Sequence, residues 1–259
     1  MHSRVLLALA RVALMGAMQY RASFLLDFFV GAFSGVGILV PLWVVYQQVP
    51  EVGGWSWPEA LLVTAFFLVL QGIIGTFVEP NLGAVVEGVR SGQLDYLLLK
   101  PPDSQLVASL TLVAPARLWE VAAGLGAGAW AMRSLPTPGL GDVLLAFGLQ
   151  LSGLVAIYGL WIIVTTTSFW FVRVDNLRWL LTAAMDTGRW PVSIYKGWVR
   201  LMLTVVVPVA IVTSYPAMAV LGRIDAVLVV EAGAVALGML VVSRLFWVYA
   251  LRHYTSASS

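Results

Sequence analysis

The sequence predicts an all-α polytopic membrane protein, and three observations support this fold class. Hydrophobic residues make up 60% of the 259 residues and charged residues only 11%, whereas about 25% of the residues in ordinary soluble domains are charged. The apolar residues are grouped in blocks long enough to cross a hydrocarbon core of about 30 Å as helices, which takes about 20 residues each. These blocks also lack the short apolar and polar alternation that is typical of membrane β-barrels.

We expect one transmembrane domain over residues 1–259, in which an interfacial helix at 1–21 precedes six transmembrane helices. Arg4 and Arg11 lie seven residues apart on one face of the first helix, and aliphatic residues cover the other face. This pattern is typical of helices that lie in the membrane interface. The six spans are expected at residues 24–46, 60–78, 112–132, 143–172, 201–221 and 226–251.

Charged residues within the expected spans are candidates for function, because a charge in lipid is costly. They are Asp27, Arg117, Glu120 and Glu231. Arg117 and Glu120 are three residues apart on one helix face and can form an ion pair. Asp27 and Glu231 lie near the ends of their spans, where contact with the interface explains them more simply than a proton relay does. The spans lack the mid-membrane carboxylate that a proton-driven carrier more often has.

The fifth expected span, 201–221, is interrupted by Pro208 and by Tyr215-Pro216. Proline removes a helical hydrogen bond and its ring clashes with the preceding turn. Two prolines in one apolar run therefore predict a helix that breaks and re-enters the membrane. Such a break is tolerated where protein or a water-lined path satisfies the freed backbone groups.

The segment 89–101, between the second and third spans, predicts a short amphipathic helix in aqueous surroundings. Leu94, Leu97 and Leu98 recur at helical spacing, Gly92 lies near the start, and Pro101 followed by Pro102 prevents continuation. The apolar face of such a helix requires a groove to fill. A helix that lies on the bilayer surface explains the periodicity equally well.

The distribution of positive charge predicts the orientation in the membrane. Six spans place both termini on one side, together with the polar segments 79–104 and 173–200, and a surface helix is expected at 177–185. Of the 15 lysines and arginines, Arg133 and Arg223 fall on the opposite side, which leaves thirteen on the side of the termini. Because cytoplasmic loops are enriched in Lys and Arg, the termini and both polar segments are expected in the cytosol.

The sequence offers little material for catalysis. It has no cysteine and only two histidines, His2 and His253, one near each end. Neither histidine has a partner at a recognisable motif spacing, so no nucleophilic triad, metal site or bound cofactor is expected in this chain. The two lysines precede Pro101 and Gly197, so the Gly-Lys-Ser/Thr ending of a phosphate-binding loop is absent and the chain is not expected to hydrolyse ATP. The net charge of +2 is too small to suggest nucleic acid.

Several segments together resemble the permease subunit of type-2 ATP-binding-cassette exporters, the ABC-2 family. The segment Arg90-x-Gly92-x-Leu94-Asp95, followed by leucines and Lys100-Pro101, is similar to the coupling helix of that family, with Gln93 and Asp95 in place of its threonine and glutamate. Further along the chain, several short motifs resemble those of a bacterial subfamily of such permeases. They are Arg189-Trp190-Pro191, Ile194-Tyr195, Val207-Pro208, Pro216-Ala217, Leu221-Gly222-Arg223 and the ending 252–259.

The resemblance implies a half-transporter in the bacterial cytoplasmic (inner) membrane, with both termini cytosolic. Two permease chains, identical or related, would form the export path and sit on two separate ATPase subunits, which would bind the ATP and Mg²⁺. Leu94, Leu97 and Leu98 would fill a groove on the ATPase, and Arg90, Asp95 and Lys100 would fix the orientation at its rim. The re-entrant element between spans five and six would cap the path, and it corresponds here to Pro208, Tyr215, Pro216, Gly222 and Arg223.

Two other classes of function remain open at the level of the sequence. One is an ion-coupled carrier or channel that works without an ATPase. The other is a membrane enzyme that acts on lipids, against which the scarcity of catalytic groups argues. The sequence does not define the cargo: aromatic, glycine-rich spans suit a lipid-like, amphipathic or polymeric molecule, but the same composition also serves helix packing.

Overall fold

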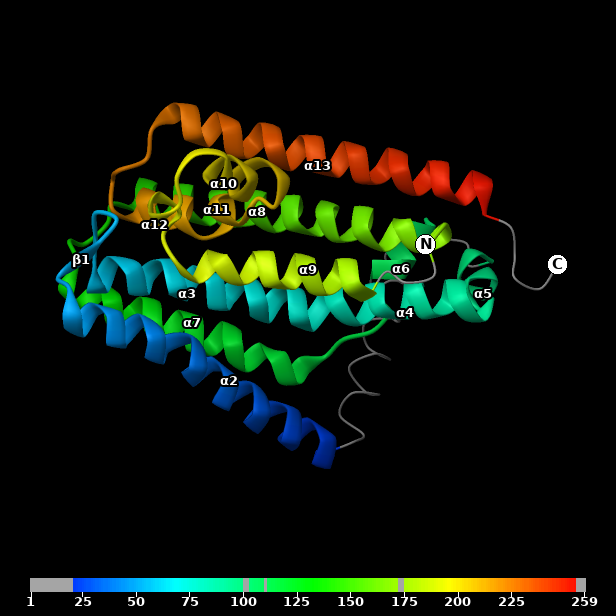
Figure 1. Cartoon of the computed structure of the whole chain (residues 1–259), viewed down its shortest axis with the longest axis horizontal. Helices are drawn as coiled ribbons and strands as arrows, with labels where there is room; N and C mark the ends of the chain where they lie inside the picture. The colour runs from blue at the N-terminus through cyan, green and yellow to red at the C-terminus, as the bar shows by residue number, and fades with distance from the viewer. Residues whose placement is uncertain (1–20, 100–102, 110, 172–174, 255–259) are drawn as a thin grey trace.

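The computed structural model describes residues 21–99, 103–109, 111–171 and 175–254. These residues form one bundle in which the long helices lie side by side (Figure 1). The interfacial helix expected at 1–21 lies almost entirely outside the described residues. The long elements are α2 (Arg21–Gln48), α3 (Trp57–Ile73), α4 (Glu79–Ser91), α7 (Leu118–Ala131), α8 (Leu140–Thr166) and α13 (Ala226–His253).

The remaining elements are short and lie at the ends of the long helices or between them. They are β1 (Glu51–Val52), β2 (Trp55–Ser56), α5 (Leu94–Leu98), α6 (Ser104–Ser109), α9 (Asp175–Met185), α10 (Gly197–Leu201), α11 (Val209–Val212) and α12 (Ser214–Val220). Five 3₁₀ turns and two π-helical turns extend or connect these elements: η1 (Ile74–Val78), η2 (Pro115–Arg117), η3 (Met132–Ser134), η4 (Thr167–Phe169), η5 (Asp186–Arg189), η6 (Val192–Ile194) and η7 (Met202–Val206).

A two-residue β-hairpin marks one end of the bundle, which we call the hairpin end. Glu51 pairs with Ser56, and Val52 pairs with Trp55. The turn between the strands needs positive φ at both central residues, and these are Gly53 (φ 62°) and Gly54 (φ 82°). The helices α3, α8 and α13 begin at this end, and α5 and α6 lie at the opposite end, which we call the α5 end (Figure 1).

The longest helical element runs from the hairpin end to the α5 end without a break. It comprises α3, the π-helical turn η1 and α4, residues 57–91, so the helix continues thirteen residues beyond the span expected at 60–78. The backbone N–H of Ser56 donates to the carboxylate of Glu59 at 2.9 Å, which caps the start of the helix. The helix ends at Ser91 because Gly92, with φ 73°, takes the left-handed conformation.

The described residues contain four helices that are long and apolar enough to cross a membrane, or five if one bent pair counts as a span. The four are Phe28–Gln48, Trp57–Ser91, Leu140–Phe169 and Ala226–His253. The third expected span, 112–132, is shorter than predicted, because its α-helix α7 has 14 residues and reaches about 21 Å at about 1.5 Å per residue.

The fifth expected span is broken, as the prolines predicted. Helical residues 197–206 and 209–220 meet at an angle of 67°, with Pro208 in the break. The second break was expected at Pro216, but this residue lies in the first turn of α12, where proline is tolerated because its missing N–H has no partner within the helix. The chain instead interrupts its helix at Thr213.

The structure corrects the interpretation of residues 173–200 as one polar segment at one end. As this segment proceeds, its contacts move along the long helix 57–91 toward the N-terminus of that helix. Arg178 lies beside Gly83, and Asp186 accepts a hydrogen bond from the side-chain amide of Gln71 at 3.3 Å. Further along, Ser193 accepts a hydrogen bond from the indole N–H of Trp55 at 3.0 Å. The chain therefore crosses the length of the bundle here, since α9 contacts α8, and η5, which follows α9, contacts α3.

This crossing reduces the asymmetry of positive charge. Arg189 belongs to the hairpin end, because its carbonyl accepts a hydrogen bond from Thr64 in α3. Lys196 and Arg200 follow it, and Arg200 is close enough to Tyr215 to act on that side chain electrostatically. When these three residues are counted on the opposite side, ten lysines and arginines remain on the side of the termini and five lie on the other side, which still favours the same orientation.

Candidate functional site

The segment predicted as a coupling helix consists of two helices joined at Gly92. The expected single helix over 89–101 is divided, because α4 ends at Ser91 and α5 covers only Leu94–Leu98. A residue with a Cβ is strained at the φ of 73° that this junction requires, so glycine suits the position. Lys100 and Pro101 lie outside the described residues.

The apolar face of α5 packs against its own chain. Leu94 is 1% exposed and belongs to the same cluster as Leu82 and Val85 of α4 and Ala108 of α6, while Leu97 and Leu98 are partly buried against that cluster. Leu94 therefore packs within its own chain, where the sequence led us to expect a groove on another protein. The large apolar side chains that α5 and its C-terminal end expose are Tyr96 (74%) and Leu99 (80%).

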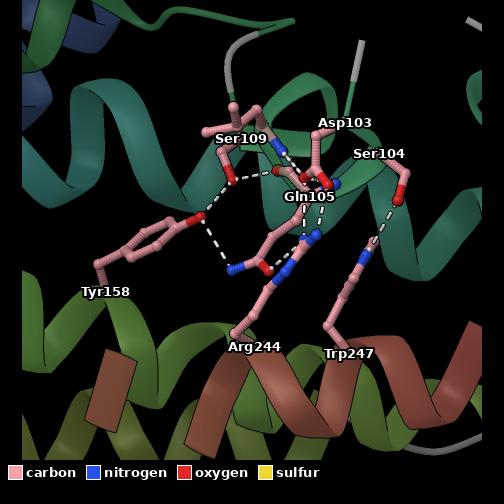
Figure 2. Close-up of polar contacts among 8 residues, drawn as sticks. Asp103, Ser104, Gln105, Ser109, Tyr158, Arg244 and Trp247 are labelled. Atoms are coloured by element: carbon pink, nitrogen blue, oxygen red, sulfur yellow. Dashed lines mark hydrogen bonds and ion pairs between the residues drawn. The ribbon is translucent and has the colours of Figure 1, made fainter. Parts of the chain in front are cut away.

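A polar network ties the segment after α5 to α13 (Figure 2). The guanidinium of Arg244 donates to both carboxylate oxygens of Asp103, at 3.0 and 2.6 Å, a bidentate geometry that is among the stronger polar contacts in proteins. The same carboxylate accepts the backbone N–H groups of Gln105 and Leu106 at 3.1 and 3.3 Å and so caps α6. Asp103 thus orients α6 and fixes it to α13 at once.

Four further contacts extend this network to α8 and strengthen the link to α13. Gln105 accepts from Arg244 at 3.2 Å and donates to the hydroxyl of Tyr158 in α8 at 3.5 Å. The same hydroxyl lies 2.8 Å from Ser109 Oγ. The indole N–H of Trp247, which is fully buried, donates to Ser104 at 3.1 Å. We call these contacts, with the Asp103–Arg244 pair, the α6 network.

The electrostatics of Asp103 follow from this geometry. The hydrogen bonds from Arg244 are the largest cause that lowers the pKa of the Asp103 carboxyl below its ordinary value, and the backbone N–H groups add to the effect. Burial opposes it only in part. The carboxylate is therefore held in its charged form at neutral pH.

Sequence reasoning did not find the α6 network. Asp103 and Arg244 are 141 residues apart, and no local spacing joins them. The only signal in the sequence is that Arg244 interrupts the last apolar span, and a charge inside a span needs a partner. That partner proves to be on the segment directly after the predicted coupling helix.

The charges predicted inside the spans fall into separate local contacts. Arg117 and Glu120 form the expected ion pair at 3.0 Å. Glu231 accepts a hydrogen bond from the hydroxyl of Tyr215 at 3.1 Å. Asp27 lies in α2, away from these pairs in the sequence. In the part of the chain that the structure describes, no group of three or more His, Cys, Asp or Glu side chains is arranged to hold a metal ion.

The residues predicted to cap the path lie at the hairpin end. Tyr215 and Pro216 are buried in α12, and Gly222 takes a positive φ of 65° in the turn that leads to α13. Arg223, in the same turn, forms an ion pair with Glu59 of α3 at 2.5 Å. This pair fixes the start of α13 to the start of α3, and sequence reasoning did not predict it.

Comparison with known proteins identifies the family. A family model described as "ABC-2 family transporter protein" matches residues 34–258, which is most of the chain. No curated protein and no solved structure matches significantly. The matched range includes the α3–α4 element, α5, the α6 network and the broken pair of helices. The chain therefore belongs to the ABC-2 family of transporter proteins, whose members are membrane subunits of ABC transporters.

Proposed function

We propose that this chain is the permease subunit of an ATP-driven exporter, and that α5 receives the force from a separate ATPase subunit. Two permease chains, identical or related, enclose the path for the cargo. The ATP and Mg²⁺ are bound by the ATPase chains, and the permease performs no chemistry. The protein lies in the bacterial cytoplasmic membrane with both termini and α5 in the cytosol.

The observation that supports this proposal best is the mechanical continuity between α5 and the bundle. Residues 57–91 form one continuous helical element that ends directly at the Gly92 junction. The α6 network connects the next segment to α8 and α13. A displacement of α5 therefore acts on three long helices at once, and a packed bundle responds to such a displacement as a rigid body or by switching between packings rather than by continuous deformation.

The exposed apolar side chains give the proposed contact with the ATPase. Tyr96 and Leu99 are 74% and 80% exposed at the tip of the molecule. Aromatic side chains at the centre of an interface commonly contribute most of its binding energy. Leu94, Leu97 and Leu98 pack α5 against its own chain. We therefore assign the apolar contact with the ATPase, which the sequence suggested for these leucines, to Tyr96 and Leu99.

The proposal is tested by co-purification with the ABC ATPase encoded beside the permease gene. Tyr96→Asp and Leu99→Asp are expected to abolish co-purification while the permease still inserts into the membrane. Leu140→Asp is the matched control, because Leu140 is 77% exposed at the hairpin end. Retained association of both α5 variants would contradict the proposed contact. Transport by the purified permease in liposomes without any ATPase would favour an ion-coupled carrier instead.

A further inference from the structure

A cavity of about 600 Å³ lies between α2, the η1–α4 part of the long helical element, η2 and α9. Most of this bundle is apolar, but the cavity wall includes Arg117, Arg178 and Glu79. Three charged side chains gather on this wall, although only 11% of the residues of the chain are charged. These residues are therefore candidates for contact with a polar molecule.

Two glycines on the wall leave room for the two guanidinium groups. A Cβ atom placed on Gly75 would lie 2.5 Å from Nε of Arg117, so no larger residue fits without moving that side chain. A Cβ on Gly83 would lie 3.5 Å from a terminal nitrogen of Arg178, an ordinary contact. The same helical element thus positions both arginines along one side of the cavity.

The two arginines differ in how they are neutralised. Arg117 is paired with Glu120 at 3.0 Å, and Glu79 interacts electrostatically with Glu120, so both acids are grouped on the side of Arg117. Arg178, on α9, has no acidic partner among the side chains that the structure describes. Its guanidinium carbon lies 5.9 Å from the centroid of the Trp161 ring.

A buried nitrogen of Arg178 lacks a hydrogen-bond acceptor. Nε of Arg178 is inaccessible to solvent and has no partner among the described residues. An unsatisfied buried donor costs about 1–3 kcal/mol, and more when it is charged. Because Nε is inaccessible, an anion in the cavity would balance the charge of Arg178 through the terminal nitrogens, and the planar guanidinium suits carboxylate and phosphate oxygens in particular.

The mouth of the cavity continues into an apolar surface. Val30 of α2 lines the cavity and is 65% exposed. On the same helix, Phe29 is 65% and Phe33 is 82% exposed. A molecule whose anionic group reaches Arg178 can therefore place an apolar chain along α2, where that chain takes the position of a lipid chain against Phe29 and Phe33.

We propose that this cavity binds the anionic group of an amphipathic molecule, with Arg178 as the principal cation, Arg117 as the second, and the exposed face of α2 in contact with the apolar chain. A phosphate or a carboxylate meets this requirement. That the bound molecule is cargo rests on the function proposed above, but binding itself does not depend on it.

The proposal is tested by native mass spectrometry of the full chain in a neutral detergent, with dodecyl phosphate as the probe. Arg178→Gln is expected to weaken binding by about tenfold or more, the loss expected for a charge-assisted hydrogen bond. Arg133→Gln, which removes the same charge from an exposed position outside the cavity, is expected to bind as the unmodified chain does. Equal binding by both variants would overturn the proposal.

A second pair of variants keeps the arginines and changes only the space. Gly83→Leu places a side chain in the cavity and is expected to weaken binding of dodecyl phosphate to the same extent. Gly37→Leu is the control, because a Cβ on Gly37 meets no atom within 4 Å. Unchanged binding by Gly83→Leu would contradict the location of the site, even if Arg178→Gln failed to fold.

Two further probes test the chemical class of the ligand. Dodecyltrimethylammonium is expected to bind at least about tenfold more weakly than dodecyl phosphate, and equal binding would overturn the role of the arginines. Inorganic phosphate is also expected to bind more weakly, and equal affinity would overturn the role of the apolar chain. If dodecyl phosphate binds through Arg178 but no ATPase associates with the chain, the site stands and the proposed function fails.

Discussion

The hairpin end and the α5 end of the bundle are each held by one pair of an arginine and a carboxylate, but the two pairs differ in burial. At the hairpin end, Glu59 is 9% exposed and its partner Arg223 is 53% exposed. At the α5 end, Asp103 is 34% and Arg244 is 46% exposed. Both carboxylates also cap a helix, so the difference in exposure is what distinguishes the two ends.

This difference indicates which end can shift at low free-energy cost. Water replaces the partner of an exposed ion pair with little loss, since such pairs contribute about 0.2–1 kcal/mol. A buried carboxylate that loses its partner has no such substitute, and the loss is several times larger. The hairpin end is therefore expected to keep its packing. The α5 end, where we propose that the ATPase acts on the permease, is the end that can reorganise.

The largest expected effect is on the apolar contacts, which should be equally strong at both ends. Leu94→Ala at the α5 end and Leu42→Ala at the hairpin end each remove a side chain that is 1% exposed. Each should lower the free energy of unfolding by about 3 kcal/mol, the usual result for a buried leucine. Thermal unfolding of the purified chain in detergent measures this loss of stability. A Leu94→Ala variant as stable as Tyr96→Ala would show that α5 does not pack on its own chain.

The next largest effect is expected at the hairpin end. Arg223→Gln leaves the charge of Glu59 largely buried without its cation and should lower the free energy of unfolding by about 2 kcal/mol. The matched control is Arg133→Gln, which removes a charge for which no acidic partner is seen among the described residues. Equal unfolding temperatures for the two variants would remove the distinction between the ends.

A smaller effect on stability is expected for the pair at the α5 end. Asp103→Asn keeps an oxygen that can cap α6 but removes the ion pair with Arg244. The free energy of unfolding should fall by about 1 kcal/mol, the upper end for an exposed pair, because the geometry is bidentate. ATP hydrolysis by the assembled transporter should nevertheless become less dependent on transport, because α6 is less firmly tied to α13. Unchanged coupling in this variant would argue that force does not pass through the α6 network.

The smallest effect is a dependence on pH. The pKa of Asp103 is lowered in the folded chain, so its contribution to stability is complete above the ordinary pKa of aspartate, about 4, and is lost as the pH falls through the lowered value. The difference in unfolding temperature between the unmodified chain and Asp103→Asn should therefore be constant from pH 7 to about pH 5 and shrink below about pH 4. A difference that grows on acidification would contradict the ion pair.

The sequence predicted the membrane class and a helix that includes Leu94, Leu97 and Leu98, but neither the helix break at Gly92 nor the partner of these leucines. Helical spacing shows that Leu94, Leu97 and Leu98 share a face. It does not show whether that face packs against its own chain or against another protein, because both environments are apolar. The structure places Leu82 and Val85 beneath that face.

The course of the segment 173–200 could not be predicted from local pattern. Its charges resembled those of a solvated loop, and α9, with 11 residues, is too short to produce the apolar signal of a span. The contacts that determine its direction join residues more than one hundred positions apart, such as Gln71 with Asp186. The arginines of the proposed anion site, Arg117 and Arg178, are brought together by the same long-range packing.

The π-helical turn Ile74–Val78 makes the length of the α3–α4 element as important as its composition. A π turn holds one residue more than an α turn, and each residue of an α-helix advances by about 100° around the axis. Deleting one residue from this turn would leave an ordinary α turn, so Leu82 and Val85 would stay in the core and Gly92 would keep its direction. The same deletion in the regular α-helix of α3 would rotate everything after it by about 100° and turn Leu82 and Val85 out of the core. A single-residue deletion within Ile74–Val78 should therefore be tolerated far better than one within α3.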